Sequence, residues 1–168
     1  MEIRPVDPGD RQALLDFANR VPERDKSFGD RTLLTQVAIA GWTQAVPERR
    51  LIAVDDDGTV AGIVTVVPGV GWTSHVGDLR VVVLPEYRGQ GIGRRLAAGG
   101  QEIAESLGMS KLMIEITATN TGGLAMFRAF GFTEEARLPG HVRDLNGDPQ
   151  DLLLLSRWLD GSGRLPTA

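Results

Sequence analysis

The segment from Val81 to Leu96, VVVLPEYRGQGIGRRL, limits the possible folds more than any other part of the chain. An apolar strand ends in three closely spaced glycines, and an amphipathic helix begins near Gly91. The next strand, KLMIEIT, follows that helix at 111–117. A strand, a helix and a second strand in this order form a βαβ crossover, whose two strands run parallel.

The rest of the chain predicts a hairpin meander before this crossover and a terminal hairpin after it. Pro5 favours an edge position for the first strand, and Asp10 is a candidate N-cap for the first helix. The order predicts a mixed α+β fold, with a mostly antiparallel sheet of about seven strands and helices on both faces. We expect one domain over 1–160 and a flexible tail over 161–168. The predicted strands are 2–6, 49–54, 59–67, 73–84, 111–117, 132–144 and 150–158, and the predicted helices are 7–21, 30–45, one from about 91, and 121–130.

Composition argues against several classes of function. The formal net charge of −4 and the absence of a basic run disfavour a nucleic-acid partner. No apolar run approaches the ~20 residues that span a bilayer, and the N-terminus shows no signal-peptide pattern, so we expect no membrane partner. The chain has no cysteine, which excludes disulfides, thiolate metal sites and a cysteine nucleophile, and which fits a cytoplasmic location. No spacing of His, Asp and Glu suggests a metal site.

The glycine turn has the features of an anion site. A helix N-terminus offers unpaired N–H groups and partial positive charge, glycines let the backbone approach a ligand, and Arg88 and Arg94 add cationic donors. A plain strand-to-helix turn is the alternative. Gly93 is followed by Arg94-Arg95 and not by Lys-Ser/Thr, which excludes a Walker A loop, and the third glycine of a dinucleotide fingerprint is missing.

Two motifs together resemble one known family. Arg88-x-x-Gly91-x-Gly93 after a strand is similar to the acetyl-CoA pyrophosphate loop of the GNAT superfamily of N-acetyltransferases. Asn120 and the FGF sequence at 130–132 resemble its next motif at the expected distance. The resemblance is specific over roughly 76–132. It implies the GNAT fold, acetyl-CoA as acyl donor without a metal, and a small-molecule or peptide amine as acceptor, and it allows a homodimer.

The resemblance also assigns cofactor contacts. It places backbone groups for the pantetheine amides near Val81 and Val83, on a strand that splays from its neighbour. Asn120 matches a position that contacts the cofactor arm, although a helix N-cap explains this residue equally well. Phe127 stands where many members carry a tyrosine that protonates the leaving thiolate. The pyrophosphate contacts implied are Arg88, Gly89, Gln90, Gly91, Ile92, Gly93 and Arg94.

Acetyl transfer to an amine needs a group that removes a proton. Glu115 is the first candidate, because a glutamate at this position is the proposed base in the ribosomal-protein alanine N-acetyltransferases that the segment resembles. Asp78 is the second, because it matches a glutamate of phosphinothricin-type acetyltransferases. Ordinary structural carboxylates are the alternative for both. The only histidines are His75 and His141, and His75 could carry a proton.

The acceptor itself is not named by the sequence. In the GNAT fold the first two helices and the last hairpin form the acceptor cleft, and these are the least recognisable parts of this chain. Phe28, Trp42 and Trp72 could line such a cleft or pack in the core. A non-catalytic acyl-CoA-binding module is the rival interpretation, favoured by Phe127 and opposed by Glu115 and the intact glycine turn.

Overall fold

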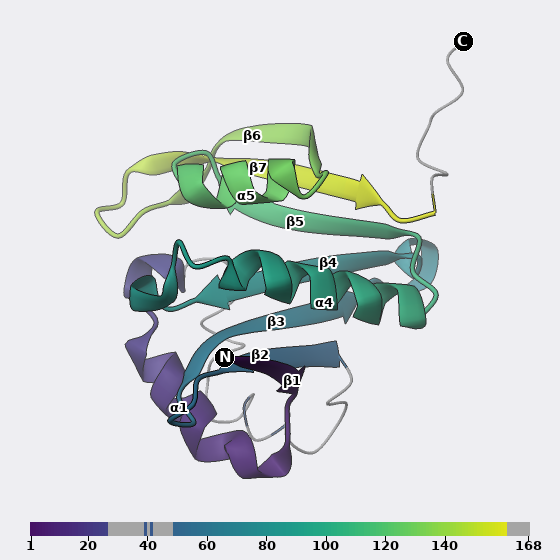
Figure 1. The fold of residues 1–168 in the computed structure, drawn as a ribbon. Helices are drawn as coiled ribbons and strands as arrows, with labels where there is room; N and C mark the ends of the chain where they lie inside the picture. Colours follow the sequence, from purple (N-terminus) through teal and green to yellow (C-terminus); the bar gives the residue numbers. More distant parts are fainter. Residues whose placement is uncertain (27–38, 40, 42–48, 161–168) are drawn as a thin grey trace. The chain divides into compact units, whose positions relative to one another are not determined.

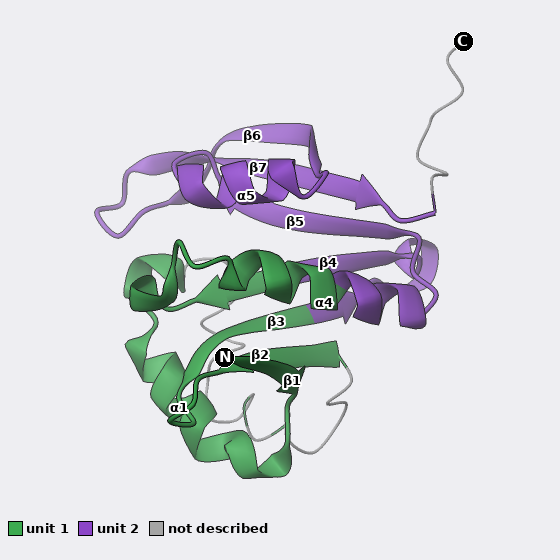
Figure 2. Cartoon of the chain, viewed as in Figure 1, with its two compact units in different colours: residues 1–65, 80–100 green, residues 66–79, 101–168 purple. Residues whose placement is uncertain are grey.

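The computed structural model describes residues 1–26, 39, 41 and 49–160 (Figure 1). The chain forms two compact units, unit 1 with Met1–Thr65 and Arg80–Gly100, and unit 2 with Val66–Leu79 and Gln101–Ala168 (Figure 2). The predicted helix 30–45 lies almost entirely outside the described residues. Phe28, Trp42 and the predicted tail 161–168 lie outside them as well.

Seven strands form one mixed sheet, which confirms the predicted fold class. Their hydrogen-bonded order is β1-β2-β3-β4-β5-β7-β6. The β4–β5 pairing is parallel, whereas the registered pairs of β1–β2, β2–β3, β5–β7 and β6–β7 are antiparallel. The strands are β1 (Glu2–Pro5), β2 (Arg50–Val54), β3 (Val60–Pro68), β4 (Val76–Val83), β5 (Lys111–Thr117), β6 (Thr133–Arg143) and β7 (Pro149–Trp158), and the α-helices are α1 (Arg11–Arg20), α4 (Ile92–Ser106) and α5 (Thr121–Ala129).

The first helix begins later than predicted, and its cap differs. A 3₁₀ turn over Pro8–Asp10 precedes α1, and Asp7 caps that turn by accepting from the Gly9 N–H at 2.8 Å. Asp10 occupies the predicted N-cap position of α1, but its side chain makes no capping bond. Its carboxylate instead accepts from both terminal guanidinium nitrogens of Arg4 at 2.7 Å. These bonds lower the pKa of Asp10. The edge position predicted from Pro5 is confirmed, since β1 is the first strand of the sheet.

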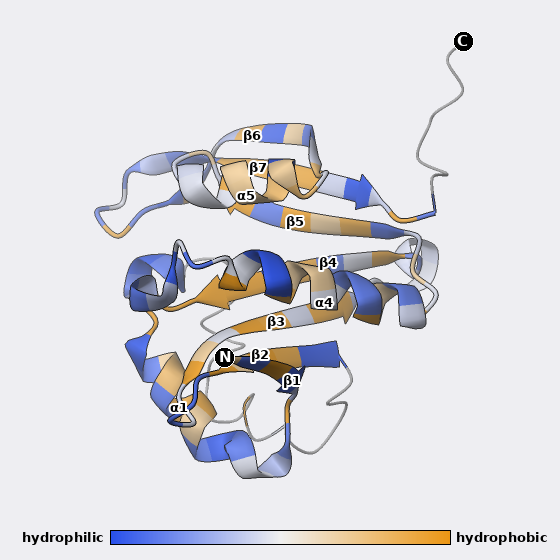
Figure 3. Ribbon diagram, viewed as in Figure 1, coloured by the Kyte–Doolittle hydropathy of each residue, from blue (hydrophilic) through white to orange (hydrophobic). Residues whose placement is uncertain are grey.

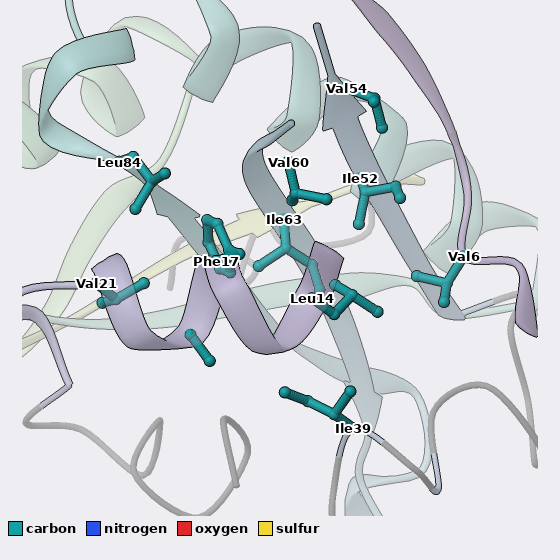
Figure 4. Close-up of a cluster of buried hydrophobic side chains, with 11 residues drawn as sticks. Val6, Leu14, Phe17, Val21, Ile39, Ile52, Val54, Val60, Ile63 and Leu84 are labelled. Atoms are coloured by element: carbon teal, nitrogen blue, oxygen red, sulfur yellow. The ribbon is translucent and has the colours of Figure 1, made fainter. Parts of the chain in front are cut away.

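Unit 1 packs helices on both faces of its strands. Leu14 and Phe17 of α1 are buried against Ile52 and Ile63 in a cluster of aliphatic side chains (Figure 4). Neighbouring strand residues point to opposite faces. Accordingly, a Cβ on Gly62 would lie 2.9 Å from a Leu96 methyl of α4, on the face away from α1. In Figure 3 hydrophobic residues are concentrated on the strands, while α1 mixes hydrophobic and hydrophilic positions, as expected for a helix with one buried side.

Unit 2 is built on β5, with α5 on one face. Leu112, Ile114 and Ile116 of β5 are buried, and a Cβ on Gly123 of α5 would meet Ile116 at 2.7 Å. The residues between these three therefore point to the opposite face. Of the two roles expected for Trp72, packing in the core is wrong, because its side chain is 99% exposed in the β3–β4 connection.

Candidate active site

The glycine turn joins the end of β4 to the start of α4 and has a left-handed backbone at two positions. A 3₁₀ turn over Pro85–Tyr87 precedes it. Gly89 has φ 74° and Gly91 has φ 78°, values that disfavour any residue with a Cβ. A Cβ at either position would meet no atom within 4 Å. Backbone conformation, and not packing, therefore requires these two glycines, and the space beside them is open.

The start of α4 presents backbone donors at this turn. The Arg95 N–H donates to the Gly91 carbonyl at 3.1 Å, so Gly91 occupies the N-cap position. The N–H groups of Ile92, Gly93 and Arg94 are the first three of the helix and have no acceptor within it. The Ile92 side chain is buried, which leaves only its backbone for a ligand. Together with the helix dipole, these donors suit an anion of the pyrophosphate type.

Side chains from elsewhere in unit 1 hold the turn in place. The Tyr87 hydroxyl donates to Asp55 at 2.6 Å, a bond that lowers the pKa of Asp55 and raises that of Tyr87. Glu86 forms an ion pair with Arg20 of α1, and the Gln90 side-chain amide donates to the Glu86 carbonyl at 3.2 Å. The turn is thus fixed to both the β2–β3 connection and α1.

Arg88 is engaged by protein groups on both sides. Its Nε donates to the Val83 carbonyl at 3.0 Å, and its Nη2 donates to Asp25 at 2.7 Å. The side chain is 42% exposed. Arg88 therefore links the end of β4 to Asp25, and the Asp25 carboxylate balances the charge of the guanidinium beside the turn.

The pantetheine prediction for Val81 and Val83 depends on the direction in which their backbone groups point. The Leu84 N–H donates to the Ala61 carbonyl of β3 at 2.9 Å. Because backbone groups alternate along a strand, the N–H and C=O groups of Val81 and Val83 point away from β3. The β4–β5 register ends at the pair Asp78–Met113, so neither valine takes part in it.

In unit 2, Asn120 and Phe127 both belong to α5 or its cap. The Asn120 side chain accepts from the Gly123 N–H at 3.0 Å, which confirms the N-cap role. Its amide nitrogen donates none of the hydrogen bonds found among the described residues, so it could still bind a ligand. The Phe127 ring is 7% exposed and meets the Phe132 ring edge-on, with centroids 5.4 Å apart. Phe127 is thus a core residue with no proton to give.

Two glutamates on strands β5 and β6 of unit 2 differ in their environment. Glu135 of β6 accepts from Lys111 Nζ at 2.7 and 2.9 Å. These bonds and one with Ser156 lower its pKa. Glu115 of β5 is exposed and has no ion pair or side-chain hydrogen bond with any residue that the structure describes. Only Glu115 is therefore available to take a proton from a ligand.

The other candidate proton carriers are less available. Asp78 lies half-buried on β4 opposite Met113, and other groups of the protein already engage it. The His75 ring stacks on Trp158 with centroids 6.3 Å apart. His141 is exposed within an irregularity of β6. Among the described residues no group of three or more His, Asp or Glu side chains could hold a metal ion, and no helix is long and apolar enough to cross a membrane.

The glycine turn and the open backbone of β4 lie within one matched region. The model of the Acetyltransferase (GNAT) family matches residues 13–132. The chain belongs to the GNAT family of acetyltransferases. A mycothiol acetyltransferase of Kocuria rhizophila is 31% identical over 138 residues, which are 79% of this chain and 46% of that protein. This GNAT chain therefore spans less than half the length of that relative.

Solved structures agree with the assignment. A ribosomal-protein-alanine N-acetyltransferase from Brucella melitensis is 27% identical, with a TM-score of 0.79 over 95% of this chain and 100% of that one. A phosphinothricin acetyltransferase from Sinorhizobium meliloti in complex with acetyl-CoA has a TM-score of 0.82 over 99% and 92% of the chains. At 19% identity this second likeness shows the GNAT fold alone.

The predicted site residues of this GNAT chain divide between the two units. Unit 1 holds the valine backbone of β4 and the whole glycine turn, and unit 2 holds Asp78, Glu115, Asn120 and Phe127. Sequence reasoning missed Asp55 and Asp25, which hold Tyr87 and Arg88 from 32 and 63 residues away. No local signal marks such distant partners.

Proposed function

We propose that this GNAT protein transfers an acetyl group from acetyl-CoA directly to a primary amine. The observation that carries the proposal is the open glycine turn, where three helix N–H groups of unit 1 have no acceptor within the helix. A pyrophosphate supplies the acceptors that these donors need. Acetyl-CoA supplies an activated acyl group, and the chain supplies its binding and the movement of the proton.

Backbone groups bind the donor in this proposal. The amides of Ile92, Gly93 and Arg94 hold the pyrophosphate, with Gly89 and Gly91 keeping the approach free of side chains. The outward N–H and C=O groups of Val81 and Val83 pair with the pantetheine amides. The Val83 carbonyl already accepts from Arg88, so Arg88 yields part of that bond when pantetheine enters or shares the carbonyl with it.

Glu115 removes the proton. The amine must be neutral to attack, so one ammonium proton first passes to the Glu115 carboxylate, directly or through water. The nitrogen then forms its bond to the acetyl carbon as the carbon–sulfur bond breaks, and the second nitrogen proton passes through water to the leaving thiolate. Glu115 suits this role because it is exposed and has no cationic partner in the part of the chain that the structure describes. Asp78 is the second candidate. The chain contains no cysteine, so no acyl-cysteine step is available.

Phe127 is the observation that favours a second function, a non-catalytic acyl-CoA-binding module. It leaves the thiolate without a tyrosine donor, although a thiol of pKa about 8.5 is a tolerable leaving group near neutral pH. Release of free thiol from acetyl-CoA with a panel of amines separates the two functions. Amine-dependent thiol release supports the transferase, whereas tight acetyl-CoA binding without release for any amine supports the binding module.

A further inference from the structure

The register of β5, β7 and β6 shows which side chains surround Glu115 on its face of unit 2. Glu115 is paired with Leu154 of β7, and Leu154 with Ala136 of β6. Paired residues of an antiparallel ladder point to the same face, with Cβ atoms about 4.5–5.5 Å apart. We call this surface the Glu115 face. By the register, its members around Glu115 are Lys111, Met113, Glu115, Thr117, Thr133, Ala136, Leu138, Leu152, Leu154, Ser156 and Trp158.

On the Glu115 face, the exposed carboxylate of Glu115 lies among apolar side chains. Glu135, which is bonded to Lys111 and Ser156, is a second carboxylate on this side. Met113, Leu154, Ala136 and Leu138 are half-buried, so part of each is open to a ligand. Of the described strand positions of unit 2 on this side, Lys111 is the one basic residue, and its Nζ is bonded to Glu135. Among the described residues no cation pairs with Glu115, so its charge can serve a cation that comes from outside the protein.

Resting on the proposed transfer, we infer that the acceptor is a primary amine carried on an apolar body, without a carboxylate next to the nitrogen. The ammonium group pairs with Glu115, and the apolar body lies over Leu154, Ala136 and Leu138. After the proton has passed to Glu115, the neutral nitrogen remains beside the same strand. One side chain thus serves for recognition and for proton removal.

The same face discriminates against α-amino acids. The α-carboxylate of an amino acid would lie close to Glu115, and two like charges a few ångströms apart repel each other. A free basic side chain that could hold the ligand carboxylate is absent from the described strand positions of this face, because Lys111 is occupied by Glu135.

Leu154 is the residue that sets specificity. It lies directly opposite Glu115. Its side chain is half-buried, so the exposed part offers apolar surface that a bound ligand would remove from water. Leu154→Asn keeps a side chain of similar length and removes that apolar surface. Leu145 is the matched control, since it belongs to the same hairpin, is 63% exposed and lies outside the face.

The test compares two ligands that differ by one carboxylate, 2-phenylethylamine and phenylalanine. Their binding is measured by calorimetry on the full chain saturated with coenzyme A, so the result does not depend on turnover. We expect 2-phenylethylamine to bind at least tenfold more tightly than phenylalanine. Leu154→Asn should remove most of this affinity, and Leu145→Ala should not change it.

Glu115→Gln provides a second variant at an exposed position, where misfolding is not expected. Loss of the charge should bring the affinities for the two ligands close to each other. Equal affinities in the wild-type protein, or a preference for phenylalanine, would overturn the inference while leaving the transferase proposal intact. Failure of the protein to bind coenzyme A or to release thiol with any amine would instead count against the proposed function.

Discussion

In our proposals, the glycine turn of unit 1 and the Glu115 face of unit 2 bind their ligands by different means. At the turn the donors are backbone N–H groups. Gly89 and Gly91 contribute by having no side chain, which permits the left-handed backbone and leaves the approach open. At the face the chemistry belongs to side chains, and the partners of Glu115 come from strands that are distant in the sequence.

This difference determines what each region tolerates. A backbone site demands particular dihedral angles, so few residue types fit and the sequence there is recognisable. A side-chain site demands only that the right residues meet across a sheet, and many sequences satisfy that condition. We therefore infer that the turn specifies the donor common to the family, whereas the face specifies an acceptor particular to this chain.

The largest predicted effect separates the two glutamates of unit 2. Glu115→Gln should lower kcat on the order of 10² or more, with acetyl-CoA affinity nearly unchanged, because it removes a proton acceptor and not a group that binds acetyl-CoA. Glu135→Gln is the matched control, since Lys111 and Ser156 already occupy Glu135. Steady-state kinetics with an active amine measures both variants. Equal losses in the two would show that Glu115 has no special role.

The next effect tests the backbone site. Gly91→Val should weaken coenzyme A binding at least tenfold, about 1.4 kcal/mol, because a β-branched residue disfavours φ 78° and its side chain enters the open approach. Gly108→Val is the control, with φ 74° and equally open surroundings at the other end of α4. Calorimetry should find a lower affinity for coenzyme A in Gly91→Val only. Similar losses of affinity in both variants would show that the turn has a structural role and does not bind the cofactor.

A smaller effect is expected at Phe127. Phe127→Tyr should raise the single-turnover rate several-fold if thiolate protonation limits transfer, with little change in cofactor affinity. The ring is 7% exposed, so its new hydroxyl must find a partner or reduce stability. Rapid-quench measurement of both proteins gives the rate, and thermal unfolding gives the stability. An unchanged rate in a folded variant would show that protonation is not limiting.

The smallest effect concerns how the turn is held. Tyr87→Phe should weaken coenzyme A binding less than tenfold and lower Tm at neutral pH, because the hydroxyl no longer bonds Asp55. The folded-state pKa of Asp55 is depressed, so the stability it contributes is present above its unfolded pKa and is lost as pH falls through the folded pKa. The Tm difference between wild type and variant should therefore shrink below about pH 4. A difference that stays constant with pH would contradict this assignment.

The parts of the molecule that local sequence determines were predicted well. Alternation and turn residues predicted the described strands, and the helix after Gly91 was placed to within a residue of its start at Ile92. The start of α1 was missed because the Arg4–Asp10 ion pair competes with capping, and that pair depends on how the chain folds back. Asp25 and Asp55 were missed for the same reason.

The site could be predicted in part only. Motif spacing identified Glu115, Asn120 and the turn, but it could not show that Lys111 neutralises Glu135 and not Glu115. That outcome depends on the irregular register between Glu134 and Ala136, which brings Glu135 within reach of Lys111. Strand register of this kind is a property of the assembled sheet.

Amide chemical shifts test the central claim most directly, namely that the free N–H groups at the start of α4 bind the pyrophosphate of coenzyme A. A ¹⁵N-labelled protein is titrated with coenzyme A and, separately, with pantetheine, which lacks the pyrophosphate. We predict that the amide resonances of Ile92, Gly93 and Arg94 shift strongly with coenzyme A and little with pantetheine. Tight binding of coenzyme A without any shift of these three amides would contradict the account.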